Sequence, residues 1–144
     1  MNTAIEIESA VRKLNAHYCD AVMRRDGELW RSLWHTDARW FFLGEWIEGR
    51  EAIFSRWQQA MAGFPVVYHR ASGEIIDVDG EAAHTRVYVD EQIIDAKGNA
   101  LHIVGVYNDD VVVHNGKWLY ASRHFNLIYQ GAGTLTQEGW LGYS

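Results

Sequence analysis

Apolar residues in the first third of the chain recur with the spacing of an amphipathic helix. Between residues 5 and 23 they fall near the helical period, which predicts one long helix. Asp26 follows, and the next apolar residues, at 29, 30, 33 and 34, again have helical spacing. Because Asp is a preferred N-cap, we expect Asp26 to begin a short second helix. A third helical pattern spans residues 49–63 and ends before Pro65.

The rest of the chain has the pattern of strands separated by short turns. Residues 38–43 predict an aromatic strand, and a turn is expected at Gly44-Glu45. Asn115-Gly116 is a strong hairpin signal. Four longer strands are expected, at residues 66–78, 82–94, 101–113 and 117–130. Successive strands with short turns form a meander, so helices followed by a sheet predict the α+β class. A curved sheet covered by helices on one face leaves an open mouth, which is a natural ligand site.

Aromatic residues are the unusual part of the composition. The chain has 144 residues, which predicts one domain over 1–144 with a C-terminal tail at 131–144. Seven Trp, seven Tyr and five Phe exceed what a small core holds, so a ring-lined cavity or an oligomer interface is expected. The aromatic sheet face predicts a homodimer or homotrimer.

Charge and cysteine content exclude several classes of protein. The net charge is −6 with no basic run, which argues against a nucleic-acid partner. No apolar stretch approaches the ~18 residues of a membrane helix, so no membrane partner is expected. The N-terminus is acidic and polar, unlike a signal peptide. A single cysteine excludes an intrachain disulfide and a Cys-based zinc site, which favours a reducing cytoplasm.

Several segments resemble one family. They are "YCDAVMRRD" at 18–26, "LWHTDARWFFLGEWIEGREAI" at 33–53, "VYHRASG" at 67–73 and "GVYNDDVVVHNGKWLYASRHFN" at 105–126. These segments and the expected order of helices and strands resemble the SnoaL-like branch of the NTF2-like superfamily, and the resemblance covers residues 5–129. The resemblance implies a cone in which N-terminal helices pack on a strongly curved, mainly antiparallel mixed sheet. Relatives include dehydratases, a dehydrochlorinase, polyketide cyclases, ketosteroid isomerases, epoxide hydrolases and non-catalytic small subunits of ring-hydroxylating dioxygenases.

The resemblance also implies four catalytic residues. Hexachlorocyclohexane dehydrochlorinase, scytalone dehydratase and bile-acid 7α-dehydratase use a His–Asp dyad, whose positions match His69 and Asp26. A neutral His69 would accept a proton, and Asp26 would fix its tautomer. The dehydrochlorinase pattern W-x-[FY]-x-x-R places Arg123 in the site, where it would hold an anionic group. Ketosteroid isomerases have an oxyanion-stabilising Tyr eight residues before the Asp, the spacing of Tyr18 here.

Each of these residues also has a structural explanation. His69 could be a strand histidine that bonds a carbonyl, and Asp26 could be only a helix N-cap. Arg123 could form a surface ion pair, and Tyr18 could be a core aromatic residue. Asp109-Asp110 is interpreted as one exposed edge position beside a solvated neighbour, although an epoxide-hydrolase pattern with Arg86 and Asp90 stays open.

The expected pocket contains aromatic walls and no metal. The seven histidines show no metal-binding motif, so neither metal nor cofactor is expected. His102 or His124 could supply a second acid, and His84 and His102 could face each other across a hairpin. The candidate pocket residues, each with core packing as its alternative, are Trp30, Trp40, Tyr88, His102, Tyr107 and Phe125.

Three functions follow as hypotheses. The first is a cofactor-independent dehydratase or lyase that removes a proton from a small apolar cyclic or aromatic substrate. The second is a binding or assembly module like a dioxygenase small subunit. The third is a polyketide cyclase that uses Asp109, or an isomerase, although residues 38–42 lack the inward carboxylate that ketosteroid isomerases need.

Overall fold

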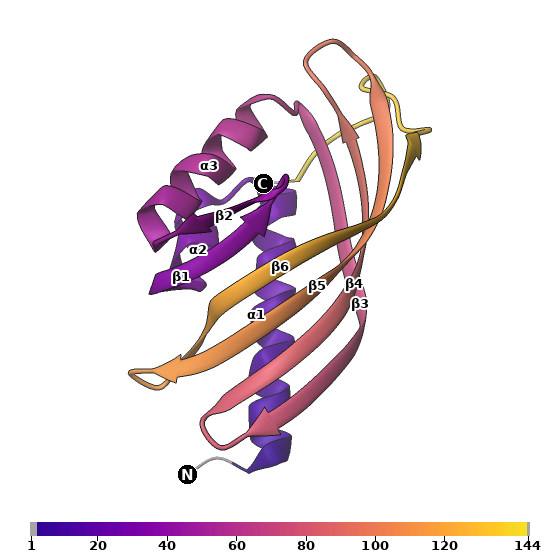
Figure 1. Ribbon diagram of the computed structural model, residues 1–144. Helices are drawn as coiled ribbons and strands as arrows, with labels where there is room; N and C mark the ends of the chain where they lie inside the picture. Colours follow the sequence, from indigo (N-terminus) through magenta and orange to yellow (C-terminus); the bar gives the residue numbers. More distant parts are fainter. Residues whose placement is uncertain (1–2, 144) are drawn as a thin grey trace.

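The computed structural model describes residues 3–143 and contains three helices and six strands (Figure 1). Two helices come first, followed by two strands, a third helix and four longer strands. The elements are α1 (Ala4–Arg24), α2 (Gly27–Ser32), β1 (Trp34–Phe42), β2 (Glu45–Glu48), α3 (Arg50–Ala62), β3 (Val66–Asp79), β4 (Ala82–Ile94), β5 (Ala100–His114) and β6 (Lys117–Ala132).

Helix α1 begins and ends where local chemistry dictates. Thr3 is its N-cap and forms a capping box with Glu6, in which each side chain bonds the backbone of the other. Arg25 closes the helix in a left-handed conformation, with φ of 57°. The predicted second helix is also confirmed, because the Asp26 side chain accepts a hydrogen bond from the Leu29 amide.

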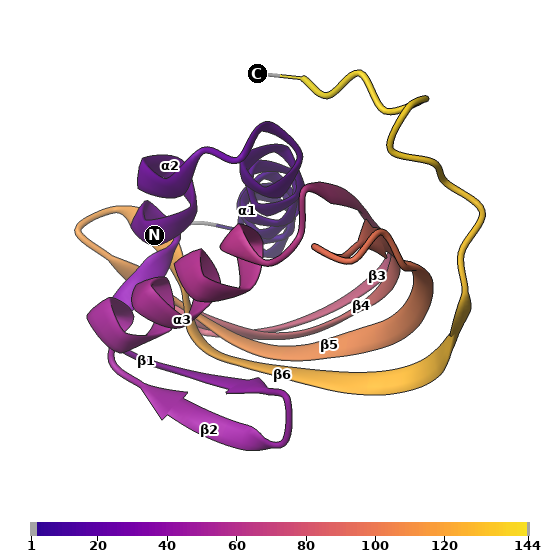
Figure 2. The same cartoon turned by 90° about the horizontal axis from the view of Figure 1, so that it is seen from above.

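The strands form one mixed sheet in the order β2-β1-β6-β5-β4-β3. All neighbouring pairs are antiparallel except β1 and β6, which run parallel. Figure 2 shows the sheet curving around the space below α1 and α3, while the tail after β6 returns toward the end of α1. The α+β cone with a strongly curved, mainly antiparallel sheet is therefore confirmed.

Strand β2 was not predicted, and β1 begins four residues earlier than expected. The predicted turn lies at Leu43-Gly44, where both residues have positive φ, and β2 follows at once as a four-residue strand. So short a strand has no detectable period. The first residues of β1 pair with Tyr120 of β6, a contact that local sequence does not reveal.

Tryptophan rings fill the space between the helices and β1. Trp30 of α2 stacks on Trp57 of α3 with ring centroids 4.6 Å apart. Trp34 and Trp40 of β1 contact Trp30 at 5.2 and 5.5 Å. These rings attach α2 and α3 to the sheet and so fix one wall of the interior.

No helix within residues 3–143 is long and apolar enough to span a membrane.

Candidate functional site

A small cavity of about 60 Å³ lies between α1, α3 and the inner face of the sheet. Most of its wall is apolar, and its polar groups come from two tyrosines, one histidine and one glutamate. The lining residues are Tyr18, Val22, Trp40, Phe42, Trp57, Ala60, Met61, Phe64, Val67, His69, Glu91 and Tyr107. An apolar cavity with a few convergent polar groups is the usual form of a ligand site.

His69 and Glu91 form an ion-paired couple in the wall of this cavity. They lie directly opposite each other on β3 and β4. The His69 Nδ1 is 2.6 Å from a Glu91 carboxylate oxygen. The imidazole is 1% exposed, and its Nε2 has no hydrogen-bond partner among the described residues. The contact with Glu91 fixes the orientation of the His69 ring, while the Nε2 atom remains without a hydrogen-bond partner among the described residues.

The structure places Asp26 elsewhere. Its carboxylate caps α2 at 3.1 Å from the Leu29 amide and does not line the cavity. The carboxylate that His69 contacts belongs to Glu91, so the expected Asp26–His69 hydrogen bond is not formed. The sequence contains the missed signal: residues 85, 87 and 89 alternate with outward residues and are buried, which directs Glu91 inward.

Two neighbours set the protonation state of His69. Burial alone would lower the pKa of this imidazole, but the Cys19 thiol and the Glu91 carboxylate raise the pKa to about 9. The protonated ring is therefore the main form at neutral pH. The pair can donate a proton from His69, and it can accept one when His69 is neutral.

Two tyrosine hydroxyls face each other beside His69. The Tyr18 and Tyr107 oxygens are 3.5 Å apart, and the Tyr18 ring lies 5.6 Å from the His69 ring. Burial raises the pKa of both phenols, although Arg123 acts in the opposite direction. Both hydroxyls therefore stay protonated, as hydrogen-bond donors toward a negative oxygen must.

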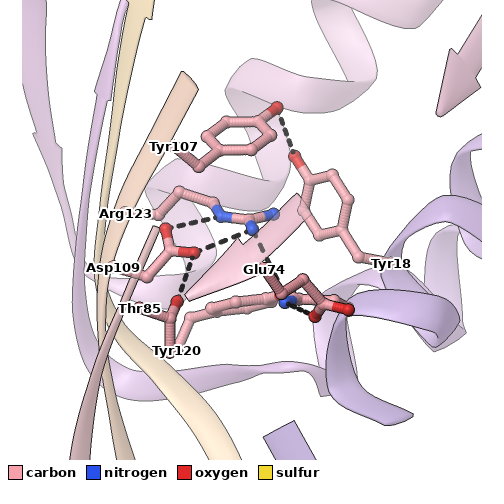
Figure 3. Close-up of polar contacts among 8 residues, drawn as sticks. Tyr18, Glu74, Thr85, Tyr107, Asp109, Tyr120 and Arg123 are labelled. Atoms are coloured by element: carbon pink, nitrogen blue, oxygen red, sulfur yellow. Dashed lines mark hydrogen bonds and ion pairs between the residues drawn. The ribbon is translucent and has the colours of Figure 1, made fainter. Parts of the chain in front are cut away.

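Arg123 lies behind the tyrosines and is bound on all sides (Figure 3). Its Nε and one terminal nitrogen donate to the Asp109 carboxylate at 2.8 and 2.9 Å. Its guanidinium carbon is 3.7 Å from the Tyr107 ring centroid and 4.2 Å from that of Tyr120. Arg123 does not line the cavity, so its expected contact with a leaving group is replaced by a buried ion pair.

Asp109 corrects a second expectation. It is 0% exposed and accepts a further hydrogen bond from Thr85 at 3.1 Å, whereas Asp110 is exposed. The adjacent residues lie on opposite faces because strand side chains alternate. The interpretation of Asp109 as an exposed edge position is therefore wrong. Its carboxylate is occupied by Arg123, which leaves little support for a role as a cyclase acid.

A hydrogen-bonded chain extends this cluster to the edge of the sheet. The Tyr120 hydroxyl donates to the Asn15 side chain at 2.6 Å, and the Asn15 amide donates to Glu74 at 2.6 Å. Figure 3 shows Tyr18, Tyr107 and Tyr120 around the Arg123 side chain, with the Asp109 carboxylate against its guanidinium group. These contacts fix the Tyr120 side chain beside Arg123.

The six expected pocket walls divide into three groups. Trp40 and Tyr107 line the cavity. Trp30 stacks behind Trp57, and Phe125 packs behind Tyr107 at 5.3 Å, so both support the wall without lining it.

Tyr88 and His102 lie outside the cavity and correct the prediction. Tyr88 is 45% exposed, because its strand neighbours Val87 and Val89 occupy the inner face. His102 bonds the exposed Asp90 at 2.6 Å and pairs with Gln92 across the strands, not with His84. Over residues 3–143, no group of three or more His, Cys, Asp or Glu side chains is placed to hold a metal ion.

Comparison with known proteins identifies the family. The model of the SnoaL-like domain matches residues 3–124. A scytalone-dehydratase-like protein of Novosphingobium aromaticivorans superposes with a TM-score of 0.83 at 19% identity, over 91% of this chain and 90% of that one. Hexachlorocyclohexane dehydrochlorinase LinA-type3 of Novosphingobium barchaimii gives 0.80 at 17% identity, over 89% and 90%.

The Rv3472 protein of Mycobacterium tuberculosis, whose function is unknown, gives a TM-score of 0.76 at 26% identity, over 86% of this chain and 72% of that one. No curated protein matches the sequence. The family model covers most of the chain, and the structural similarity covers the same helices and sheet. The chain belongs to the SnoaL-like domain family.

Proposed function

We propose that the protein is a cofactor-independent lyase of the dehydratase or dehydrohalogenase type. The observation that carries the proposal is a buried histidine–carboxylate pair, His69 and Glu91, in the wall of an apolar cavity. A related fold occurs in a scytalone-dehydratase-like protein and in a dehydrochlorinase, which makes elimination the natural class of reaction. Here Glu91 takes the part that the resemblance assigned to Asp26.

Proton transfer at His69 is the central step. In its neutral form the imidazole takes a proton from a carbon next to a carbonyl group, and Glu91 stabilises the imidazolium that results. The electron pair moves into an enolate, whose oxygen receives hydrogen bonds from Tyr18 and Tyr107. The enolate then expels a hydroxide or halide from the β-carbon. Hydroxide takes the proton from the His69 imidazolium and leaves as water, whereas a halide leaves as the anion and His69 releases its proton to solvent.

The cavity favours a small apolar substrate. Its present volume of about 60 Å³ holds only a few water molecules. Ligand pockets usually measure roughly 300–1,000 Å³, so an alicyclic ring needs movement of the side chains at the rim. Two lining residues are the candidates for this movement. Met61, at the end of α3, has a flexible side chain, and Phe64 lies in the loop after α3.

A β-hydroxyketone provides a direct test. We expect the protein to convert 3-hydroxycyclohexanone to the conjugated enone, measured by the ultraviolet absorbance of the product. At about pH 9 and above, where His69 has lost its proton, Glu91→Gln should lower turnover by about 10²-fold or more, because it removes the charge that stabilises the imidazolium formed in the reaction. Asp26→Asn should have little effect, since Asn is an equally good N-cap.

Variants of Asp26, Glu91 and His69 also define the results that would contradict the proposal. A large loss in Asp26→Asn with an unchanged Glu91→Gln would restore Asp26 as the partner of His69. Equal turnover in the wild type and in His69→Gln would contradict the enzyme proposal. The protein would then fit the alternative of a binding module, for which the same fold serves without chemistry. The homodimer or homotrimer stays a prediction that light scattering can test.

A further inference from the structure

A groove of about 370 Å³ lies between α1, α2 and the start of β6. It is separate from the cavity at His69, because no residue lines both. Small-molecule sites usually measure roughly 300–1,000 Å³, and the groove falls in this range without any movement of side chains. The groove can therefore accept a ligand in the structure as it stands.

The floor of the groove is apolar. Four large side chains that line it are at most 9% exposed, and they are Leu14, Leu33, Trp118 and Leu119. A hydrocarbon chain that lies on this floor loses contact with water, and each methylene that is fully buried tightens binding by up to about fourfold. The floor therefore favours a ligand with an apolar body.

The charged or ionisable side chains that line the groove are basic. Lys13 and His17 are one helical turn apart on α1, so they project from the same face of the helix, and Lys117 is the first residue of β6. Within residues 3–143, no Asp or Glu lines the groove. The chain has three lysines and two of them lie here, although 19 acidic residues outnumber 13 Lys and Arg overall. The groove is thus a basic site on an acidic protein.

Both lysines are available to a ligand. Their side chains are exposed, and none of the ion pairs formed among residues 3–143 includes Lys13 or Lys117. The third lysine, Lys97, lies in the turn between β4 and β5, where its backbone N–H donates to Asp95 at 2.9 Å. This turn and the turn before Lys117 lie at opposite ends of β5 (Figure 1).

We propose that the groove binds small amphipathic carboxylates, with the carboxylate held by Lys13 and Lys117 and the hydrocarbon part on the apolar floor. The ammonium groups donate charge-assisted hydrogen bonds to the carboxylate oxygens, and His17 provides a further polar group on the same face of α1. An exposed ion pair alone adds at most about fivefold in affinity, so the apolar floor supplies the rest. This site goes beyond the proposed lyase and does not depend on it, because the two sites share no lining residue.

Three probes separate the two parts of the site. Octanoate carries the charge and the chain, acetate carries only the charge, and 1-octanol carries only the chain. In isothermal titration calorimetry at pH 7, we expect octanoate to bind at least about tenfold more tightly than either of the others. Octanoate that binds no more tightly than 1-octanol would contradict the role of the lysines, and octanoate that binds no more tightly than acetate would contradict the role of the floor.

Lysine variants test the charge in place. Lys13→Gln and Lys117→Gln should each weaken octanoate binding by about threefold, and the double variant by about tenfold. Lys97→Gln is the matched control, because it removes the same charge at the other end of β5, and its affinity should equal that of the wild type. Unchanged affinity in the double variant, or an equal loss in Lys97→Gln, would overturn the proposal. All three positions are exposed, so these variants should fold normally.

Trp118 reports where the ligand binds. Among residues 3–143 it is the tryptophan that lines the groove, whereas Trp40 and Trp57 line the cavity at His69. We expect octanoate to change the tryptophan fluorescence of the wild type, and Trp118→Phe to remove most of that change. A change that persists in Trp118→Phe and disappears in Trp57→Phe would place the carboxylate in the cavity and overturn the groove as its site. Since every readout is binding, a failure to detect elimination would leave these results unaffected.

Discussion

The Cys19 thiol and the Glu91 carboxylate together control whether His69 is protonated or neutral. With the pKa of His69 raised to about 9, only about 1% of the imidazole is neutral at pH 7. The neutral imidazole is the base form, and while the pH lies below the pKa its amount grows about tenfold for each unit by which the pH is raised. The two groups beside the imidazole therefore decide the pH at which the proposed reaction runs.

We accordingly expect kcat/KM for the β-hydroxyketone to rise from about pH 7 and to level off near pH 9, where His69 loses its proton. Glu91→Gln should move this rise to lower pH, since the carboxylate that raises the pKa is lost. A profile that is flat at neutral pH and falls above pH 9 would instead identify protonated His69 as a general acid.

Asp109 is the residue whose loss should cost the most stability. In Asp109→Asn the Arg123 charge stays buried without its partner, which typically destabilises a protein by about 3–5 kcal/mol. Asp110→Asn is the natural control, because Asp110 is the adjacent residue and its ion pair with His84 is exposed. Its change in the free energy of unfolding should stay within about 0.5 kcal/mol. Urea unfolding measures both, and equal effects would contradict the structural role of the pair.

At the scale of the elements, the close contact of β5 with β6 depends on one glycine. A Cβ at Gly105 would lie 2.3 Å from the Phe125 ring and 2.8 Å from the Asn126 carbonyl oxygen. Phe125 in turn supports Tyr107 of the cavity wall. The absence of a side chain at one position of β5 therefore allows an aromatic residue of β6 to support the site.

Gly105→Ala should lower the free energy of unfolding by about 1–3 kcal/mol, since overpacking forces side chains or backbone to shift. Gly63→Ala is the control, because Gly63 has φ of −84° and an added Cβ meets only ordinary contacts. It should be neutral or slightly stabilising. Similar losses in both variants would show that the Phe125 contact is not the cause.

Local patterns were sufficient to predict the elements but not all of their partners. The bounds of β4 agree with the prediction at both ends, and Asp26 caps α2 as expected. Pairing between distant segments was not accessible, because the β1–β6 contact joins residues that no local period relates. The sequence therefore predicted the meander and the helices, while the parallel pair and β2 came from the structure alone.

The site was predicted in part for similar reasons. His69 and Tyr18 lie together at the cavity, as the resemblance implied. The sequence prediction missed Glu91 and placed Tyr88 in the pocket. The correct positions of both side chains follow from the alternation along β4 once Val87 is assigned to the inner face of the sheet. The burial of Asp109 depends on Arg123, fourteen residues away on another strand, and so no single strand reveals it.

At the scale of the whole molecule, the sheet is continuous only when its last strand is present. β6 lies between β1 and β5, so it connects the N-terminal half of the fold with the meander. Arg123 on β6 also packs against Tyr107 of the cavity wall and against Tyr120. The cavity and the cone are thus completed by the same strand.

This topology has a consequence for synthesis on the ribosome. β1 leaves the ribosome early, yet its parallel neighbour β6 emerges only after residue 117. Until then the apolar edge of β1 has no partner on that side, and non-local pairing of this kind is slow and exposed to aggregation. A nascent chain that stalls before β6 would therefore be a client for chaperones, while release of the last strand would allow the complete sheet to form.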